Sequence, residues 1–99
     1  MITELNENNF DEKTAKGVKL VEFYTDWCGY CQRQNEILND MNEISLFKVN
    51  GEKSPVVTTK FGVNVFPTFL LLKNGKEINR YTGLHSKYEL MNILVRNMK

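Results

Sequence analysis

Short hydrophobic runs alternate with helix-spaced hydrophobic positions along this chain, which predicts alternating strands and helices. Residues 2–5 and 46–49 predict two short strands, the first of them at a sheet edge. Residues 18–25, with the sequence VKLVEFYT, form a β-branched and aromatic run with few polar interruptions. Such a run is typical of a strand covered on both faces. We therefore expect residues 18–25 at the centre of the sheet.

A hairpin is predicted in the second half of the chain. Residues 68–73, with the sequence TFLLLK, have the pattern of a buried strand, and residues 76–82 supply a partner strand. Asn74-Gly75 stands between them and is the dipeptide with the strongest preference for a two-residue hairpin turn. The two strands are therefore expected to run antiparallel.

Capping residues predict two short helices. Asn6 is expected to cap a helix that runs to about residue 16, with Phe10 as its apolar anchor and Gly17 as its stop. Ser54, which is followed by proline, is expected to cap another helix that ends before Gly62. Both helices precede predicted strands.

Two longer helices carry apolar residues at helical spacing. One begins at Cys28 or Gly29 and is expected to bury Ile37, Leu38, Met41 and Ile44. Its solvent face is expected to include Gln32, Arg33, Gln34, Asn35 and Asn39. The other opens with the capping-box sequence SKYE at residues 86–89 and carries the apolar residues Leu90, Met91, Ile93, Leu94 and Met98.

The predicted order β-α-β-α-β-α-β-β-α defines an α/β fold with a central mixed sheet flanked by helices on both faces. Ninety-nine residues with 41% hydrophobic content suit a single domain over residues 1–99. In an open sheet of this class, functional groups gather at the carboxyl ends of the strands. The strand that ends near Thr25 would place the two cysteines of the chain at such an end.

Composition and charge limit the classes of partner and the cellular compartment that we expect. With 13 basic and 12 acidic residues and no run of like charge, neither nucleic acid nor a membrane surface is expected as a partner. The first residues lack the basic segment and apolar run of a secretory signal, so we expect a cytoplasmic protein. A monomer that acts on other proteins is the expected state.

The two cysteines, Cys28 and Cys31, form a CxxC pair where the central strand turns into a helix. Such a pair can close a disulfide across one helical turn. If Cys28 lies at the helix N-terminus, the free N–H groups and the positive dipole end favour its thiolate. Cys28 would then be the attacking sulfur, and the buried Cys31 the resolving sulfur. No metal and no bound cofactor are expected.

Three other interpretations of the pair compete with this one. A zinc site needs four ligands, but the chain has no second CxxC and its single histidine, His85, is far along the sequence. A structural disulfide would gain little stability from so short a loop. Two inert core thiols fit poorly with the turn residues Gly29 and Tyr30. A cycling dithiol is the favoured interpretation.

The motifs Trp27-Cys28-Gly29-Tyr30-Cys31, Phe66-Pro67-Thr68 and Lys73-Asn74-Gly75, at these separations, resemble the thioredoxin family over essentially the whole chain. The resemblance implies a thioredoxin fold and a protein-disulfide reductase. It also implies re-reduction by a flavin-dependent reductase and disulfide-containing target proteins as substrates.

The resemblance also assigns site residues. Glu22 stands where thioredoxins usually carry a buried aspartate, and Lys48 where they carry its lysine neighbour. Pro67 matches the family's cis-proline. The substrate-docking rim would consist of Trp27, Gly29, Tyr30, Phe66, Pro67 and Gly83.

Glu22 has the clearest implied chemistry. A carboxylate buried under the cysteines should have a raised pKa and could take the proton of Cys31 when that sulfur attacks. Lys48 would oppose the rise, and a plain buried ion pair of Glu22 with Lys48 is the alternative.

The chain departs from the thioredoxin pattern at Tyr30, Phe66 and Glu36, where the family typically has a proline, a small β-branched residue and a proline. The segment between Cys31 and Lys48 is also a few residues short. A glutaredoxin-like or disulfide-isomerase-like redox protein stays open as an alternative. So does a binding module with a thioredoxin fold and incidental cysteines.

Overall fold

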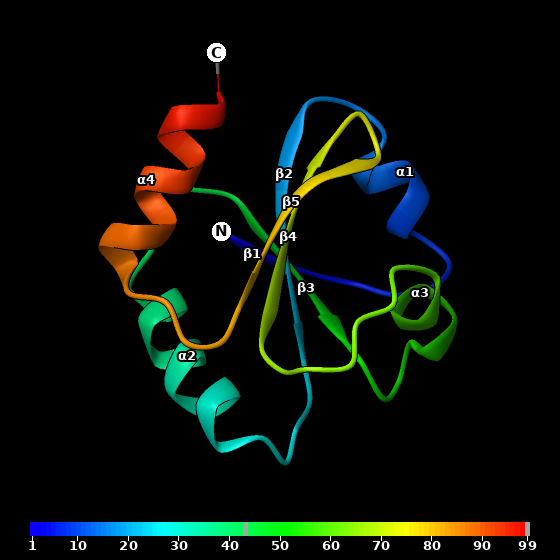
Figure 1. Cartoon of the computed structure of the whole chain (residues 1–99), viewed down its shortest axis with the longest axis horizontal. Helices are drawn as coiled ribbons and strands as arrows, with labels where there is room; N and C mark the ends of the chain where they lie inside the picture. Colours follow the sequence, from blue (N-terminus) through cyan, green and yellow to red (C-terminus); the bar gives the residue numbers. More distant parts are fainter. Residues whose placement is uncertain (43, 99) are drawn as a thin grey trace.

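The computed structural model describes residues 1–42 and 44–98, in which a five-stranded sheet lies between two pairs of helices (Figure 1). The elements follow one another as β1 (Ile2–Leu5), α1 (Phe10–Thr14), β2 (Val18–Tyr24), α2 (Gly29–Asn39), β3 (Leu46–Asn50), α3 (Pro55–Lys60), β4 (Thr68–Lys73), β5 (Lys76–Thr82) and α4 (Lys87–Asn97). The predicted order of strands and helices is confirmed.

The strands lie side by side in the order β1-β3-β2-β4-β5. β1, β3 and β2 are parallel, whereas β4 pairs antiparallel with both β2 and β5, so the sheet is mixed as expected. β2 is the central strand, and β1 is an edge strand, which confirms both predictions. The register places Glu22 of β2 between Lys48 of β3 and Phe69 of β4.

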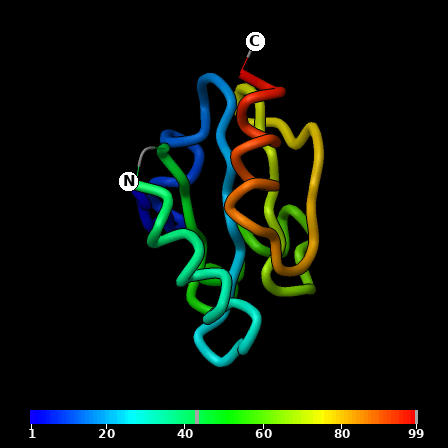
Figure 2. Tube along the Cα trace, turned by 90° about the vertical axis from the view of Figure 1, so that its left-hand side faces the viewer, coloured from blue at the N-terminus to red at the C-terminus, as the bar shows by residue number. Residues whose placement is uncertain are grey.

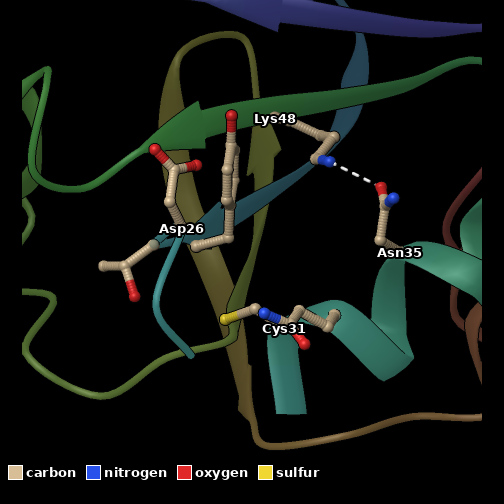
Figure 3. A pocket seen from close by; sticks show the side chains of 7 residues that line it. Asp26, Cys31, Asn35 and Lys48 are labelled. Carbon is tan, nitrogen blue, oxygen red and sulfur yellow. Dashed lines mark hydrogen bonds between the residues drawn. The ribbon is translucent and has the colours of Figure 1, made fainter. Parts of the chain in front are cut away.

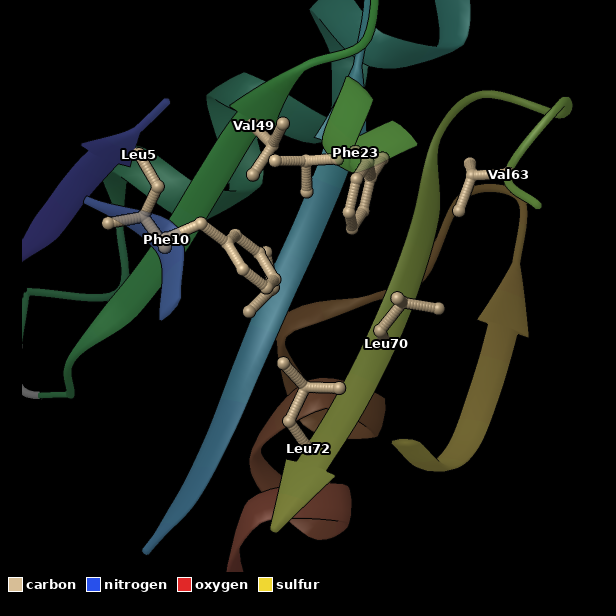
Figure 4. Packing of buried hydrophobic residues seen from close by; sticks show 9 residues of the cluster. Leu5, Phe10, Phe23, Val49, Val63, Leu70 and Leu72 are labelled. Carbon is tan, nitrogen blue, oxygen red and sulfur yellow. The ribbon is translucent and has the colours of Figure 1, made fainter. Parts of the chain in front are cut away.

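Helices α1 and α3 cover one face of the sheet, and α2 and α4 cover the other (Figures 1 and 2). Because side chains alternate along each strand, every inner strand contributes to two cores. The core under α1 and α3 contains Leu5, Phe10, Val21, Phe23, Val49, Val57, Val63, Leu70 and Leu72 (Figure 4). The core under α2 and α4 contains Leu20, Leu38, Met41, Leu46, Phe69, Leu71, Leu90, Ile93 and Leu94.

The first helix is shorter than expected, and the prediction that Asn6 caps it is wrong. Asn6 Oδ1 accepts hydrogen bonds from the backbone N–H groups of Asn8 and Asn9, which closes a turn. Asparagine side chains compete with helix formation in this way. The helix therefore begins only at Phe10 and ends at Thr14.

The second helix starts where it was expected, with Cys28 as its N-cap, but it ends at Asn39. Met41 is fully buried beyond the helix, because the chain turns at Asp40 on its way to β3. The expected continuation of the helical pattern to Ile44 is therefore wrong. The assignment of Gln34 to the solvent face is also wrong, since its exposed fraction is 0%.

The remaining turns and caps follow their local signals more closely. Asn74 and Gly75 have φ angles of 52° and 83°, as a hairpin turn of this kind requires. The capping box is present, with Ser86 and Glu89 each accepting a backbone hydrogen bond from the other. Ser54 precedes α3, but its side chain forms no capping hydrogen bond.

Candidate active site

Cys28 occupies the N-cap position of α2, immediately beyond the end of β2 and a three-residue loop. An N-cap residue needs a side-chain acceptor for a free backbone N–H of the first turn. The sulfur serves as this acceptor, because the backbone N–H of Cys31 donates to Cys28 Sγ over 3.2 Å. The Cys28 sulfur thus lies at the positive end of the helix.

Both cysteines are free thiols and both are buried. Cys28 is 8% exposed and Cys31 4%, so Cys28 is nearly as buried as Cys31. The reason is the chain before β4: the Cys28 thiol donates to the carbonyl oxygen of Phe66 over 3.4 Å. The two sulfurs differ more in their partners than in their exposure.

Cys31 lies one turn inside α2 with its thiol protonated at neutral pH. Burial, followed by the hydrogen bond with Cys28, raises the pKa of the Cys31 thiol to about 12. Charge interactions with Cys28 and Glu22 contribute to this rise, and a backbone hydrogen bond with Thr25 opposes it. The expected burial of Cys31 is confirmed.

Glu22 is an uncompensated buried carboxyl group on the face of β2 that α2 and α4 cover. It is 2% exposed, and neither carboxyl oxygen has a hydrogen-bond partner in the part of the chain that the structure describes. Burial raises the pKa of Glu22 to about 7, although the charge of Lys48 opposes the rise. Near neutral pH the group is therefore present in both protonation states.

Lys48 lies beside Glu22 in the sheet register but binds elsewhere. Its Nζ donates to Asn35 Oδ1 over 2.8 Å and lies 4.4 Å from the centre of the Tyr24 ring (Figure 3). Among the described residues, no ion pair within 4.0 Å involves Glu22. The alternative of a plain buried ion pair is thus excluded, and Lys48 acts on Glu22 through its charge.

A pocket of about 280 Å³ opens between β2, β3 and α2 beside these groups (Figure 3). The residues that line it are Tyr24, Thr25, Asp26, Cys31, Gln32, Asn35 and Lys48. Most of these side chains are polar, and Cys31 is the sulfur that reaches the pocket. A pocket of this kind can bring water to the Cys31 thiol.

The predicted docking rim is only partly assembled by contacts. The carbonyl oxygen of Phe66 accepts a hydrogen bond from the Cys28 thiol, and the peptide bond between Phe66 and Pro67 is cis. The N–H of Gly83 donates to Pro67 O over 2.8 Å. Trp27 is 68% exposed, so it is not a core residue. The exposed residues Gly29 and Tyr30 line a separate depression of about 400 Å³ together with Arg33.

Comparison with known proteins identifies the class to which this site belongs. The thioredoxin family model matches residues 1–96. The chain belongs to the thioredoxin family. It is 31% identical to the thioredoxin of Chlamydia muridarum over 98% of this chain and 99% of that protein. It is 28% identical to the thioredoxin of Staphylococcus haemolyticus, with 98% of each chain covered.

A solved structure supports the fold. The thioredoxin of Malassezia sympodialis has a TM-score of 0.87 to this chain at 19% identity, covering 99% of this chain and 94% of the other. With its close cysteine pair, this member of the thioredoxin family is a thiol-disulfide oxidoreductase that acts as a protein-disulfide reductase.

The described residues form neither a metal site nor a membrane-spanning helix. Within residues 1–42 and 44–98, no group of three or more His, Cys, Asp and Glu side chains could hold a metal ion. His85 Nδ1 instead lies 2.8 Å from the carbonyl oxygen of Gly83. No helix in the described residues has the length and hydropathy to cross a membrane.

Three residues around the site were not found by sequence reasoning. Asn35 was expected in solvent but binds Lys48, and Gln34 is buried against the loop at His85. Gly51 leaves room for a ring, because a Cβ atom there would lie 2.6 Å from Cε1 of Phe66. Each of these contacts joins segments that are distant in sequence, and no local pattern indicates them.

Proposed function

We propose that this protein reduces target disulfides with Cys28 as the attacking sulfur and Cys31 as the resolving sulfur. The observation that carries the proposal is the hydrogen bond from Cys31 N to Cys28 Sγ at the start of α2. A backbone donor and the helix dipole both favour a negative charge on this sulfur. The thiolate is the form that attacks a disulfide.

The reaction would proceed in two exchanges. The Cys28 thiolate attacks one sulfur of the target disulfide, which forms a mixed disulfide and releases the other target sulfur as a thiolate. The Cys31 sulfur then attacks Cys28 Sγ, which closes the Cys28–Cys31 disulfide and releases the second target thiolate. Two electrons pass to the target, and the protein dithiol is oxidised.

Glu22 is proposed as the acceptor of the Cys31 proton during the second exchange. Cys31 cannot attack as a thiol, and burial raises the pKa of this thiol, so the step needs an assisting base. Glu22, with a pKa of about 7, is ionised in about half of the molecules at neutral pH. The Cys31 thiol lines the pocket, and the buried Glu22 carboxyl lies behind the pocket wall, so the transfer would need a water beyond it; the charge of Lys48 keeps the Glu22 pKa from rising further.

The exposed rim supplies the docking surface in this proposal. Trp27, Gly29 and Tyr30 are exposed, whereas Phe66 and Gly83 are half-buried and Pro67 is buried at the inner edge of the rim. Aromatic side chains of this kind contribute much of the binding energy in protein interfaces. A target protein would thus lie across the end of the sheet that carries the cysteines.

A flavin-dependent reductase is proposed as the electron donor that restores the dithiol. A protein that must be re-reduced in every cycle requires a reducing compartment, so the cytoplasm belongs to the proposal. The protein is proposed to act as a monomer.

Reduction of insulin in the presence of dithiothreitol, followed by turbidity, tests the activity. The unchanged protein should accelerate precipitation, and Cys28→Ser should abolish the acceleration. Cys31→Ser should instead accumulate a mixed disulfide on Cys28, which mass spectrometry detects. A mixed disulfide on Cys31 in the Cys28→Ser variant, with turnover preserved, would reverse the two roles.

The same protein should show Cys28 as the first site of iodoacetamide labelling at neutral pH, by mass mapping after limited reaction. Its equilibrium with glutathione then separates the reductase from the isomerase-like or glutaredoxin-like alternative, because these classes differ in redox potential. Binding of targets without any turnover would support the binding-module alternative.

A further inference from the structure

Gln34 is a polar side chain in an apolar position. It lies on α2 one turn beyond Cys31, and its exposed fraction is 0%. Leaving a buried amide without hydrogen bonds costs about 1–3 kcal/mol. An apolar residue would fill the same space without that cost, so the hydrogen bonds of Gln34 indicate a specific role.

Both ends of the Gln34 amide bind the backbone of one residue. Gln34 Nε2 donates to the carbonyl oxygen of His85 over 2.9 Å, and the N–H of His85 donates to Gln34 Oε1 over 2.8 Å. The two residues are 51 positions apart. This pair of hydrogen bonds fixes both the distance and the orientation of the His85 backbone relative to α2.

The segment held by Gln34 is the connection between β5 and α4, which we define as the docking loop, residues 83–85. At its start, Gly83 N donates to Pro67 O over 2.8 Å, with Gly83 in the left-handed region at φ 88°. Within it, His85 Nδ1 lies 2.8 Å from Gly83 O. Leu84 is the exposed residue at its tip.

The His85 ring and the next element hold the loop from the other side. The ring packs edge-on against Phe69 and Tyr81, with centroid distances of 5.9 and 6.1 Å. Lys87 Nζ, at the start of α4, donates to the carbonyl oxygen of Asp40 beyond the end of α2 over 3.2 Å. The loop is thus tied to the helix that begins at Cys28 and to the proline segment that contacts the Cys28 sulfur.

We propose that Gln34 is a positioning residue for target binding, which holds the docking loop in the conformation that receives a target protein beside Cys28. The inference rests on the proposed function, which places Gly83 on the docking rim. A loop ordered before binding loses less conformational entropy when the target arrives. A small disulfide that touches only the sulfurs would gain nothing from this order.

Steady-state kinetics with two substrates test the proposal. Gln34→Met keeps the size of the side chain and removes both hydrogen bonds. We expect the KM for insulin to rise about tenfold, which corresponds to about 1.4 kcal/mol. The turnover of 2-hydroxyethyl disulfide should stay within about twofold of the unchanged protein, which a general loss of structure would not allow.

A matched control and a second variant keep the test decisive. Leu38→Ala lies one turn further on α2, is equally buried, and removes no bond to His85, so its two substrates should change together. His85→Phe keeps an aromatic ring and removes only the contact to Gly83 O, so it should raise the KM for insulin less than Gln34→Met. Should Gln34→Met fail to fold, Gln34→Glu decides, because it removes the donor to His85 O and keeps the acceptor for the His85 N–H.

Amide hydrogen exchange provides a direct readout of the two hydrogen bonds between Gln34 and the His85 backbone. The His85 N–H should exchange at least about tenfold faster in Gln34→Met, while amides of β2 keep their rates. An unchanged KM for insulin in Gln34→Met, or in Gln34→Glu where Gln34→Met does not fold, or an unchanged His85 exchange rate, would overturn the inference. If the unchanged protein reduces neither substrate, the proposed function fails instead.

Discussion

The two faces of the sheet differ in the polar groups that they bury. Under α1 and α3 the buried side chains are mostly aliphatic and aromatic, with Phe10, Phe23 and Phe61 packed at centroid distances of 5.5 to 6.5 Å. The buried hydroxyl groups there bind their own helices: Thr14 Oγ1 donates to Phe10 O and Thr58 Oγ1 to Ser54 O. This face follows the ordinary rules of a hydrophobic core.

The face under α2 and α4 combines a similar apolar core with buried groups that a stable core would not contain. Glu22 is buried without a partner in the described residues, and Cys31 is a buried thiol that must ionise. Gln34 reaches across to a loop from another part of the chain. The comparison indicates that both faces contribute apolar packing but only the face under α2 and α4 carries the chemistry, so substitutions on the two faces should have separable effects.

The largest expected effect is a loss of stability on the face under α1 and α3. Leu70 is fully buried under α1 and α3, and Leu70→Ala should lower the free energy of unfolding by about 2–5 kcal/mol, because a cavity replaces the side chain. Urea unfolding measures this loss. The turnover of insulin per folded molecule should stay within about twofold. Ile78→Ala, at a half-exposed site on β5, is the control and should cost under about 1 kcal/mol.

The next effect is a pH dependence of the folding stability, which Glu22 causes on the face under α2 and α4. The folded state raises the pKa of Glu22 from 4.5 to about 7, so folding favours the protonated carboxyl group. Between these two pH values the folded protein binds more protons than the unfolded one, and stability falls as the pH rises. Above pH 7 the loss reaches about 3 kcal/mol.

Glu22→Gln, which cannot ionise, should therefore unfold at higher urea than the unchanged protein at pH 8, with little difference at pH 4. The same variant should release the mixed disulfide more slowly than it forms it, as quenched-flow trapping would show. A release rate that matches the unchanged protein at every pH would remove Glu22 from the proposed mechanism.

A smaller effect is expected at Lys48, whose charge opposes the rise of the Glu22 pKa. Lys48→Met should raise the Glu22 pKa further, because it removes the positive charge that stabilises the carboxylate. The pH range over which stability falls should move upward by the same amount in urea titrations. Asn35→Leu removes the same hydrogen bond but keeps the charge, so this control should leave that pH range in place.

The smallest effect is expected at Tyr30, on the exposed end of α2. Tyr30→Pro removes one backbone N–H from the first turn and should make the redox potential more negative, by at most about 30 mV. The bound is low because the donor to Cys28 Sγ is the N–H of Cys31 and not that of Tyr30. Equilibration with glutathione measures the shift, and an unchanged potential would leave Tyr30 as a residue of the target interface.

Much of this protein could be predicted wherever the deciding interaction is local. The run at residues 18–25 indicated the central strand, and Asn74-Gly75 indicated the hairpin, whose two residues have the required positive φ angles. The capping box between Ser86 and Glu89 joins residues three positions apart. The spacing of Cys28 and Cys31, at the end of a predicted strand, was sufficient to place a sulfur at a helix N-terminus.

Local sequence signals gave a wrong prediction where one side chain could either cap a helix or close a turn. Asn6 has the residue type of a helix N-cap, but its side chain also closes a turn with Asn8 and Asn9. The turn is closed from both sides, because Asn9 Oδ1 also accepts a hydrogen bond from the N–H of Asn6, and α1 begins only at Phe10. The helix thus starts after the turn, and its first residue, Phe10, packs its ring against Phe23 and Phe61.

The sequence by itself thus determined the order of the elements, the central strand and the position of the cysteine pair, because each depends on residues within a few positions of one another. Only the tertiary structure decided that Lys48 binds Asn35 and not Glu22, and that Gln34 is buried against His85. The physical reason is that a polar side chain has several possible partners in water. Which of them it binds is decided when segments about 13 to 51 residues apart are brought together in one core.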